Sequence, residues 1–338
     1  MSLAVVGVIG IIALLLVLFF LGTPVGFAMT TVALPEMKKY GYDSKLSTGA
    51  IACGSTLGVV IPPSVVLIVL GLSTEQSIAK LFYGGIGAGV ILAALLMASV
   101  YVICRFRPQW GAAGPKSGVI EKLKALSGAF EMIGLFLLVM LGLYFGYFTP
   151  TEAGAAGSFF AVVISVIYGR LSWQGFVASV SDTLRISCMV ITIVADAMIF
   201  GHFLAVTRIP FDIAQWVVGL PVPNMVIMTI IFTIYIVGGA VMDALALLLI
   251  TIPIFFPVAL ELGYDLLWFA VTITVITTLG AVTPPVGVTT YVVGGMARDI
   301  ALGDVFKGVS FFLSAYLLCV AILMLFFKIV TLLPELMK

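Results

Sequence analysis

The chain has 338 residues, of which 62% are hydrophobic and only 9% are charged, and its mean hydropathy is +1.29. A soluble domain carries about a quarter charged residues, so the composition excludes a soluble globular protein. It predicts an all-α polytopic membrane protein, because open strand edges cannot face lipid. The net charge of +1 argues against nucleic acid as a partner.

A bilayer crossing takes about 20 apolar residues, which leaves room for roughly nine or ten spans or half-spans. The first apolar run ends near Leu21 and has neither a basic start nor a convincing cleavage site. We therefore expect residues 1–30 to form a retained first span rather than a signal peptide. The next segment, 31–104, contains a helix broken at 57–63 and a span over Leu81–Cys104.

The most polar loop follows this span and predicts the orientation of the chain. It carries five basic residues against Glu121, namely Arg105, Arg107, Lys116, Lys122 and Lys124. Basic loops lie on the cytoplasmic side of membrane proteins. Residues 105–222 are therefore interpreted as a cytoplasmic loop followed by connecting scaffold spans. These spans are expected at Phe130–Phe148, Gly154–Tyr168 and Ile186–Val206.

The last segment, 223–338, repeats part of the first. Leu57-Gly58-Val59-Val60-Ile61-Pro62-Pro63 returns as Leu279-Gly280-Ala281-Val282-Thr283-Pro284-Pro285, at an offset of 284 − 62 = 222 residues. The same offset relates Gly41-Tyr42-Asp43 to Gly263-Tyr264-Asp265. We predict two copies of one unit, with a hairpin tip at 238–243 and a second broken helix at 279–287. A span at Met225–Val237 precedes them, and a last span covers Val305–Val330.

Paired helix breaks inside apolar segments are typical of the binding site of a secondary transporter. The freed carbonyls suit Na⁺, and the amino ends of the half-helices suit an anionic group. Hydroxyl side chains crowd both breaks: Ser55, Thr56, Ser64, Thr277, Thr278, Thr283, Thr289 and Thr290. Any one of them alone is better explained as satisfying neighbouring backbone, whereas the paired set favours an ion site.

Other polar residues have competing interpretations. Asp196 and His202 lie in or near an apolar run. An ionisable group there is a candidate for function; alternatively, it faces the helix bundle and pairs with a helix end. Glu152 fits the first turn of a helix after Thr149. For Asp243, function and structure stay equally open. The sequence contains no nucleotide-binding loop or catalytic constellation, so we expect no enzyme and no cofactor, with an ion gradient as the energy source.

Several blocks, in this order along the chain, resemble the large membrane subunit of TRAP transporters, the tripartite ATP-independent periplasmic transporters of bacteria and archaea. They are Pro35-Glu36-Met37, Gly54 to Ser64, Phe148-Thr149-Pro150-Thr151-Glu152-Ala153, Val241-Met242-Asp243 and Thr283-Pro284-Pro285-Val286-Gly287. The resemblance implies an elevator-type Na⁺ symporter of the inner membrane, with inverted repeats and re-entrant hairpins. A small four-helix membrane subunit braces such a subunit, and a periplasmic binding protein delivers an organic acid such as a C4-dicarboxylate or sialic acid.

The resemblance also implies sodium ligands by motif. One site would use Gly58, Ile61 and Pro63, and the other Gly239, Gly280, Thr283 and Val286. For the substrate, we expect contacts from Asp243, Ser64 and Thr278.

The chain departs from the family at its first hairpin. The 222-residue offset places the first hairpin tip near residue 17, inside the first apolar run, and the family's Ser-Gly-Ser-Ser tip has no counterpart. We expect sequence to be missing between about Met29 and Val32. Two alternatives therefore stay open: a transport-incompetent subunit that acts only as a membrane scaffold, and an ion-coupled carboxylate transporter that needs no binding protein. The Thr-Pro-Thr-Glu-Ala block favours the tripartite family over the latter, and a membrane enzyme is a distant third.

Overall fold

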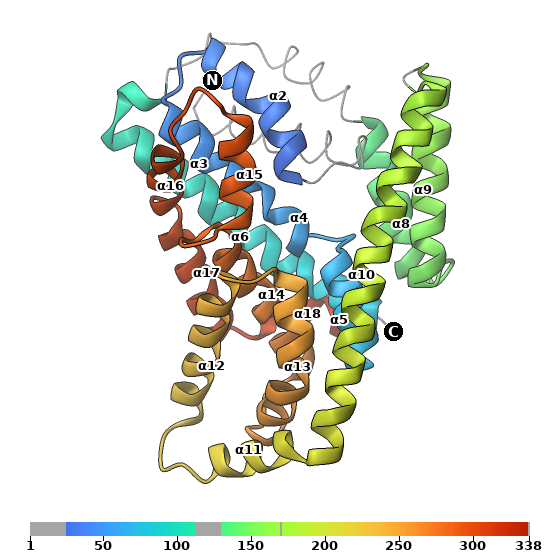
Figure 1. Ribbon diagram of the computed structural model, residues 1–338, viewed down its shortest axis with the longest axis vertical. Coiled ribbons are helices and arrows are strands. Elements are labelled where there is room, and N and C mark those ends of the chain that lie inside the picture. The colour runs from blue at the N-terminus through green and yellow to red at the C-terminus, as the bar shows by residue number, and fades with distance from the viewer. Residues whose placement is uncertain (1–24, 112–129, 170, 337–338) are drawn as a thin grey trace. The chain divides into compact units, whose positions relative to one another are not determined.

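The computed structural model describes residues 25–111, 130–169 and 171–336 (Figure 1). All regular structure in these ranges is helical. Five helical stretches within them are long and apolar enough to cross a membrane. The predicted first span up to Leu21, the expected first hairpin tip and most of the polar loop lie outside the described residues.

The helices of the first half are α2 (Val25–Lys39), α3 (Ser44–Ser55), α4 (Leu57–Val60), α5 (Val65–Thr74), α6 (Ile78–Phe106), a 3₁₀ turn η1 (Pro108–Trp110), α8 (Phe130–Tyr144) and α9 (Pro150–Ile167). The second half contains α10 (Trp173–Thr207), α11 (Ile209–Val218), α12 (Asn224–Gly239), α13 (Ala244–Glu261), α14 (Leu266–Val282), α15 (Val288–Met296), α16 (Leu302–Ser310), α17 (Leu313–Leu325) and α18 (Lys328–Glu335). The division of the chain into segments 1–30, 31–104, 105–222 and 223–338, which was proposed from the sequence, stays a prediction.

The helix bounds follow the sequence repeat. α2 ends at Lys39 and α13 ends at Glu261, 261 − 39 = 222 residues later. The starts of α3 and α14, and the ends of α4 and α14, are separated by the same offset. Both copies are therefore a helix, a short turn and a second helix that breaks. The inverted arrangement of the copies stays a prediction.

Repeated local chemistry explains these shared bounds. Gly41 and Gly263 have φ of +75° and +81°, a conformation that favours glycine and ends a helix. Two residues later, an aspartate caps the next helix. The Asp43 carboxylate accepts from the Lys45 amide at 2.8 Å, and the Asp265 carboxylate accepts from the Trp268 amide at 2.7 Å.

The helices form two compact units, each assembled from three stretches of chain. The first unit takes its described residues from Met1–Ser55, Leu96–Ser187 and Val292–Phe311. In it, α3 packs against α16 at two glycines, since a Cβ on Gly308 would lie 2.2 Å from the Lys45 carbonyl oxygen. An ion pair between Lys38 and Asp299, with atoms 2.5 Å apart, joins the end of α2 to the loop before α16.

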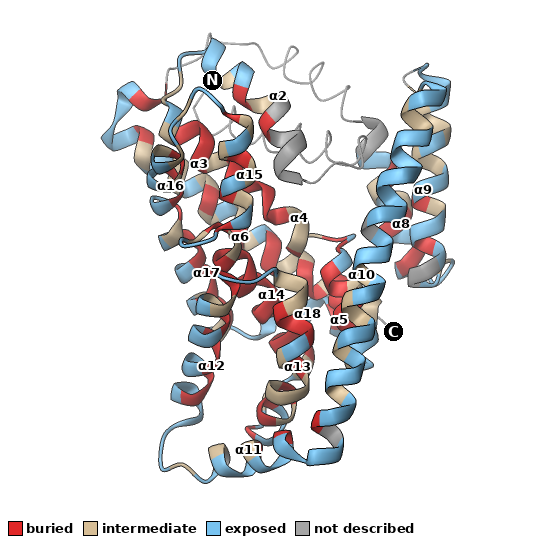
Figure 2. Cartoon of the chain, viewed as in Figure 1, coloured by how far each residue is buried: buried red, intermediate tan, exposed pale blue. Residues whose placement is uncertain are grey.

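The second unit takes its residues from Thr56–Leu95, Cys188–Tyr291 and Phe312–Lys338, and its centre is α14. Every α14 residue from Leu267 to Gly280 is buried (Figure 2). The helix contacts α4, α5, α12, α13, α17 and α18. A helix that is apolar on all sides needs such cover. The polar edge of Trp268 is satisfied as well, because its indole N–H donates to the Leu323 carbonyl at 2.8 Å.

The structure corrects three element predictions. The span expected to begin at Ile186 begins at Trp173, because a polar stretch that includes Asp182 and Arg185 hides its helical start from a hydropathy scan. The short helix α11 was not expected. The last span, expected over Val305–Val330, is one stretch long and apolar enough to cross a membrane, but it covers Leu302–Leu325 and its helix is interrupted after Ser310. Hydropathy averaged along the chain does not reveal these helix ends, because the residues stay apolar where the backbone hydrogen bonds of one helix stop and those of the next begin.

Candidate functional site: two interrupted helices

The first interruption lies between α4 and α5, in the second unit. Ile61 leaves the helical conformation, with φ −78° and ψ +126°, and α5 begins at Val65. Ser64 joins the two ends, because its hydroxyl donates to the Val59 carbonyl and accepts from the Leu67 amide. The serine thus serves one free carbonyl and one free amide of the broken helix.

Two other helices hold this interruption in place. A Cβ on Gly85 of α6 would lie 2.6 Å from the Val60 carbonyl oxygen, and one on Gly89 would lie 2.4 Å from the Ile61 side chain. The hydroxyls of Thr56 and Tyr316 are 2.6 Å apart and buried, which links the residue before α4 to α17. The first break therefore rests on glycines of α6 and a tyrosine of α17.

The second interruption lies between α14 and α15. Thr283 is extended, with φ −86° and ψ +139°, and its hydroxyl donates to the Leu279 carbonyl at 2.6 Å. Across the break, the Thr290 hydroxyl donates to the Val282 carbonyl at 2.9 Å. Both proline pairs, 62–63 and 284–285, are joined by a cis peptide bond.

A hairpin tip packs on this second break. The chain turns between the end of α12 and Asp243, which caps α13 by accepting from the Leu245 amide at 2.9 Å. The Val286 amide donates to the Ala240 carbonyl at 3.1 Å. A Cβ on Gly280 would lie 2.5 Å from the backbone of Gly239. Backbone thus meets backbone between two segments that are distant in sequence.

Comparison with known proteins identifies the family of this chain. Residues 4–329 match the family described as "Tripartite ATP-independent periplasmic transporter, DctM component". The chain belongs to the DctM family. The resemblance drawn from the sequence blocks is confirmed, and the protein is a TRAP large permease, a multi-pass protein of the inner membrane.

Curated TRAP permeases are similar to the chain over most of its length. It is 30% identical over 308 residues to the C4-dicarboxylate TRAP transporter large permease protein of Pseudomonas aeruginosa, covering 91% of this chain and 70% of that protein. It is 30% identical over 304 residues to the sialic acid TRAP transporter large permease protein of Vibrio cholerae, covering 90% and 70%. The isethionate TRAP transporter permease protein of Oleidesulfovibrio alaskensis is 33% identical over 272 residues, or 80% of this chain and 43% of that protein.

In this TRAP permease, the structure gathers the second predicted sodium set. Gly239, Gly280 and Val286 meet where the hairpin tip contacts the break, and Thr283 follows α14 directly. Ala240, whose carbonyl accepts from Val286, was missed. Its one sequence signal is its place in the tip after Gly239. The role of this set in binding Na⁺ stays a prediction.

The first predicted sodium set spans the end of α4 and the interruption after it, with Gly58 in the helix and Ile61 and Pro63 beyond it. Gly58 and Ile61 are half-buried, and Pro63 is exposed. Proline at 62 and 63 cannot donate a backbone hydrogen bond, so carbonyls here lack their usual helical donors. Among the described residues, no hairpin tip covers this break. These assignments stay predictions too.

The predicted substrate residues have different surroundings. Asp243 is exposed at the hairpin tip, whereas Ser64 and Thr278 are buried. The Thr278 hydroxyl donates to the Val275 carbonyl of its own helix at 2.6 Å. A hydroxyl that donates in this way keeps its lone pairs for a cation or a donor. Substrate contact by these three residues stays a prediction.

Most of the hydroxyls near the breaks bond to neighbouring backbone carbonyls, as expected for each of them alone, whereas that of Thr56 bonds to Tyr316. Those of Ser55, Thr277 and Thr290 also donate to backbone carbonyls, at 2.7, 2.9 and 2.9 Å. The cap predicted at Glu152 is confirmed by a reciprocal capping box with Thr149. Asp196 and His202 are exposed on α10, so burial among the helices of this chain is wrong for both.

Proposed function

We propose that this TRAP large permease couples inward Na⁺ movement to the import of an organic acid. The observation that carries the proposal is the hairpin tip packed on an interrupted helix at the end of the buried α14. Main-chain oxygens released from a helix are ligands of the kind that hard cations prefer. The second sodium site would use Gly239, Gly280, Thr283 and Val286, and the first Gly58, Ile61 and Pro63.

A carboxylate substrate would bind near the amino ends of the half-helices that follow the breaks. α5 and α15 begin directly after them. Their first amides and dipoles favour negative charge. The amino end of α13 is already capped by the Asp243 carboxylate, so we expect Asp243 to face Na⁺ or a substrate hydroxyl rather than the substrate carboxylate. Ser64 and Thr278 complete the proposed substrate contacts.

The chemical class of the substrate rests on the relatives. Those named above act, by name, on C4-dicarboxylates, sialic acid and isethionate, and another from Escherichia coli on 2,3-diketo-L-gulonate. These are small organic anions, so we propose a C4-dicarboxylate or a sialic acid for this chain. We further propose an elevator motion with inverted repeats, a small four-helix membrane subunit as partner, and a periplasmic binding protein that delivers the acid.

The alternative of a transport-incompetent scaffold rests on one feature of α2. This helix runs without a break through Met29 and Val32, the place where the sequence of the family's first hairpin was expected to be missing. If the scaffold alternative holds, the chain still binds the small subunit but takes up nothing.

Uptake in proteoliposomes tests these possibilities. The chain and its small subunit are reconstituted, the binding protein and radiolabelled acid are added outside, and a Na⁺ gradient is applied. The proposal expects uptake that collapses with the gradient. Uptake only after a family-type hairpin is inserted following Met29 would support the scaffold alternative. Uptake that does not need the binding protein would support the binding-protein-independent transporter. Uptake that is indifferent to Na⁺ would overturn the coupling.

A further inference from the structure

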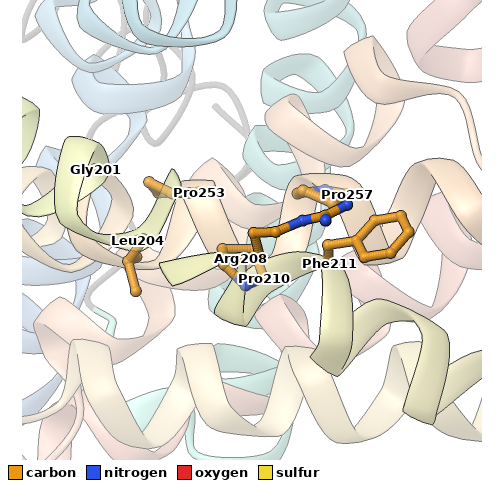
Figure 3. A pocket seen from close by; sticks show the side chains of 7 residues that line it. All are labelled: Gly201, Leu204, Arg208, Pro210, Phe211, Pro253 and Pro257. Atoms are coloured by element: carbon orange, nitrogen blue, oxygen red, sulfur yellow. The ribbon is translucent and has the colours of Figure 1, made fainter. Parts of the chain in front are cut away.

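We propose that a groove at the base of the second hairpin binds an anionic phospholipid, with its phosphate on Arg208. The groove has a volume of about 370 Å³ and lies within the second unit. Its walls are Leu204 of α10, Pro210 and Phe211 of α11, and Pro253 and Pro257 of α13 (Figure 3). Of the described residues that line it, Arg208 alone is charged.

The position of Arg208 is fixed by its backbone and by an aromatic ring. It forms the junction of α10 and α11 with φ +58°, which few non-glycine residues adopt. Its guanidinium lies 5.2 Å from the centre of the Phe211 ring, and Figure 3 shows it extending towards Phe211 and Pro257. Among the described residues, no carboxylate forms an ion pair with it; Asp212, one turn along α11, is exposed.

A guanidinium held in this way is suited to a phosphate. Stacking on a ring uses the face of the group and leaves the N–H edge free for two parallel hydrogen bonds. The rest of the lining offers few donors, since proline at 210, 253 and 257 has no backbone N–H. One cation beside apolar walls matches a ligand with one anionic head and an apolar tail.

The groove also lies near the end of α13, a helix that is long and apolar enough to cross a membrane. Pro257 precedes the end of α13 at Glu261 by four residues, or about 6 Å of helix. The ten residues of α11 extend only about 15 Å, too short to cross a bilayer. Trp216 of α11 is 68% exposed, as aromatic residues at a membrane interface are. Lipid therefore reaches this groove from the side.

A transported acid is a poorer occupant. A dicarboxylate would need a second cationic or polar side chain as a partner, and the lining residues that the structure describes include none besides Arg208. The groove also begins at Pro253, ten residues or about 15 Å along α13 from the hairpin tip at Asp243. The inference thus does not depend on the proposed function.

The test is a lipid titration of the detergent-purified protein followed by native mass spectrometry. Phosphatidylglycerol and phosphatidylcholine with identical acyl chains are compared on the wild type, on Arg208→Gln, on Arg208→Lys and on Arg185→Gln, which changes an exposed arginine of α10. We expect Arg208→Gln to weaken phosphatidylglycerol binding at least about tenfold, the effect of losing a charge-assisted hydrogen bond. Arg208→Lys keeps the charge but not the two parallel hydrogen bonds, so it should weaken binding less than Arg208→Gln does. Arg185→Gln should stay within a factor of about two of the wild type, on the same scale.

A second variant checks the groove itself while keeping Arg208. Gly201 lines it, and a Cβ there would have Pro253 as a neighbour at 3.8 Å, so Gly201→Leu should fill the space. It should weaken phosphatidylglycerol as well, with an unchanged size-exclusion profile. Equal phosphatidylglycerol binding by Arg208→Gln and wild type would overturn the proposal. So would equal binding of the two lipids by the wild type, or competition by glycerol phosphate as strong as that by the lipid.

Discussion

The first interruption, at 61–64, and the second, at 283–287, are bridged by hydroxyls that stand at different positions of the repeat. At the first, Ser64 before α5 donates to the Val59 carbonyl. At the second, Thr290 within α15 donates to the Val282 carbonyl. The 222-residue offset pairs Ser64 with Val286 and Thr290 with Ile68, so neither bridge is copied. Both copies contain the break, but a hydroxyl at a different position donates to the free backbone carbonyl in each.

The two breaks have similar sequences, but different segments of the chain pack against them. The second break meets a hairpin tip at backbone distance, through Gly239, Ala240 and Val286. The first is held by glycines of α6 and by the Tyr316 hydroxyl. We infer that the second break depends on close backbone contact with a hairpin tip, whereas the first depends on glycine contacts with α6 together with a buried side-chain hydrogen bond. Four substitutions test this difference between the two breaks. Their effects are compared by measuring the thermal unfolding of the purified protein.

The largest effect is expected from Gly280→Ala. Its Cβ would lie 2.5 Å from the Gly239 backbone, which cannot rotate away as a side chain can. Overpacking of this kind costs about 3 kcal/mol, so we expect a large fall in the unfolding temperature and loss of stabilisation by Na⁺. Gly295→Ala is the matched control, because a Cβ there has no neighbour within 4 Å. Similar unfolding temperatures for the two variants would contradict the close contact.

The next effect is expected from Tyr316→Phe at the first break. The change deletes the hydroxyl bonded to Thr56 while keeping the ring. Loss of a buried hydrogen bond with one polar partner left behind costs about 2 kcal/mol. A double-mutant cycle with Thr56→Val measures the coupling, and the double variant should lose less stability than the two single losses together. Additive losses would show that the pair does not support the break.

A smaller effect is expected from Thr290→Val. The shape is kept, and the bond that joins α15 to the Val282 carbonyl is removed. We expect a loss of about 1 kcal/mol. Thr289→Val, at the neighbouring half-buried position, should change the unfolding temperature less. The opposite order would place the bridge at Thr289 instead.

The smallest effect on stability is expected from Asp243→Asn. Asparagine caps a helix about as well as aspartate, so the bonds to the Leu245 and Ala246 amides can persist. The change in stability should stay within about 0.5 kcal/mol. Removing the charge should nevertheless raise the Na⁺ concentration needed for half-maximal stabilisation, as measured by sodium titration of the unfolding temperature. An unchanged titration would exclude Asp243 from the cation side of the site.

The sequence predicted the elements whose chemistry is local. Gly41 with Asp43, and Gly263 with Asp265, mark where one helix ends and the next begins, because left-handed glycine and carboxylate caps act within a few residues. The capping box at Glu152 was predictable for the same reason. Hydropathy was less informative at α10 and α11, since a helix that carries polar residues or is short gives no long apolar run.

The membrane class, the repeat, the positions of both breaks and the family could all be predicted from the sequence. Which residues meet could be read from the folded structure alone. It set the Ala240 carbonyl against Val286, Gly280 against Gly239, and Thr56 against Tyr316. It also built the groove around Arg208. The physical reason is that breaks and caps follow from the dihedral preferences of single residues, whereas contacts across distant segments depend on how the helices pack, which no local pattern encodes.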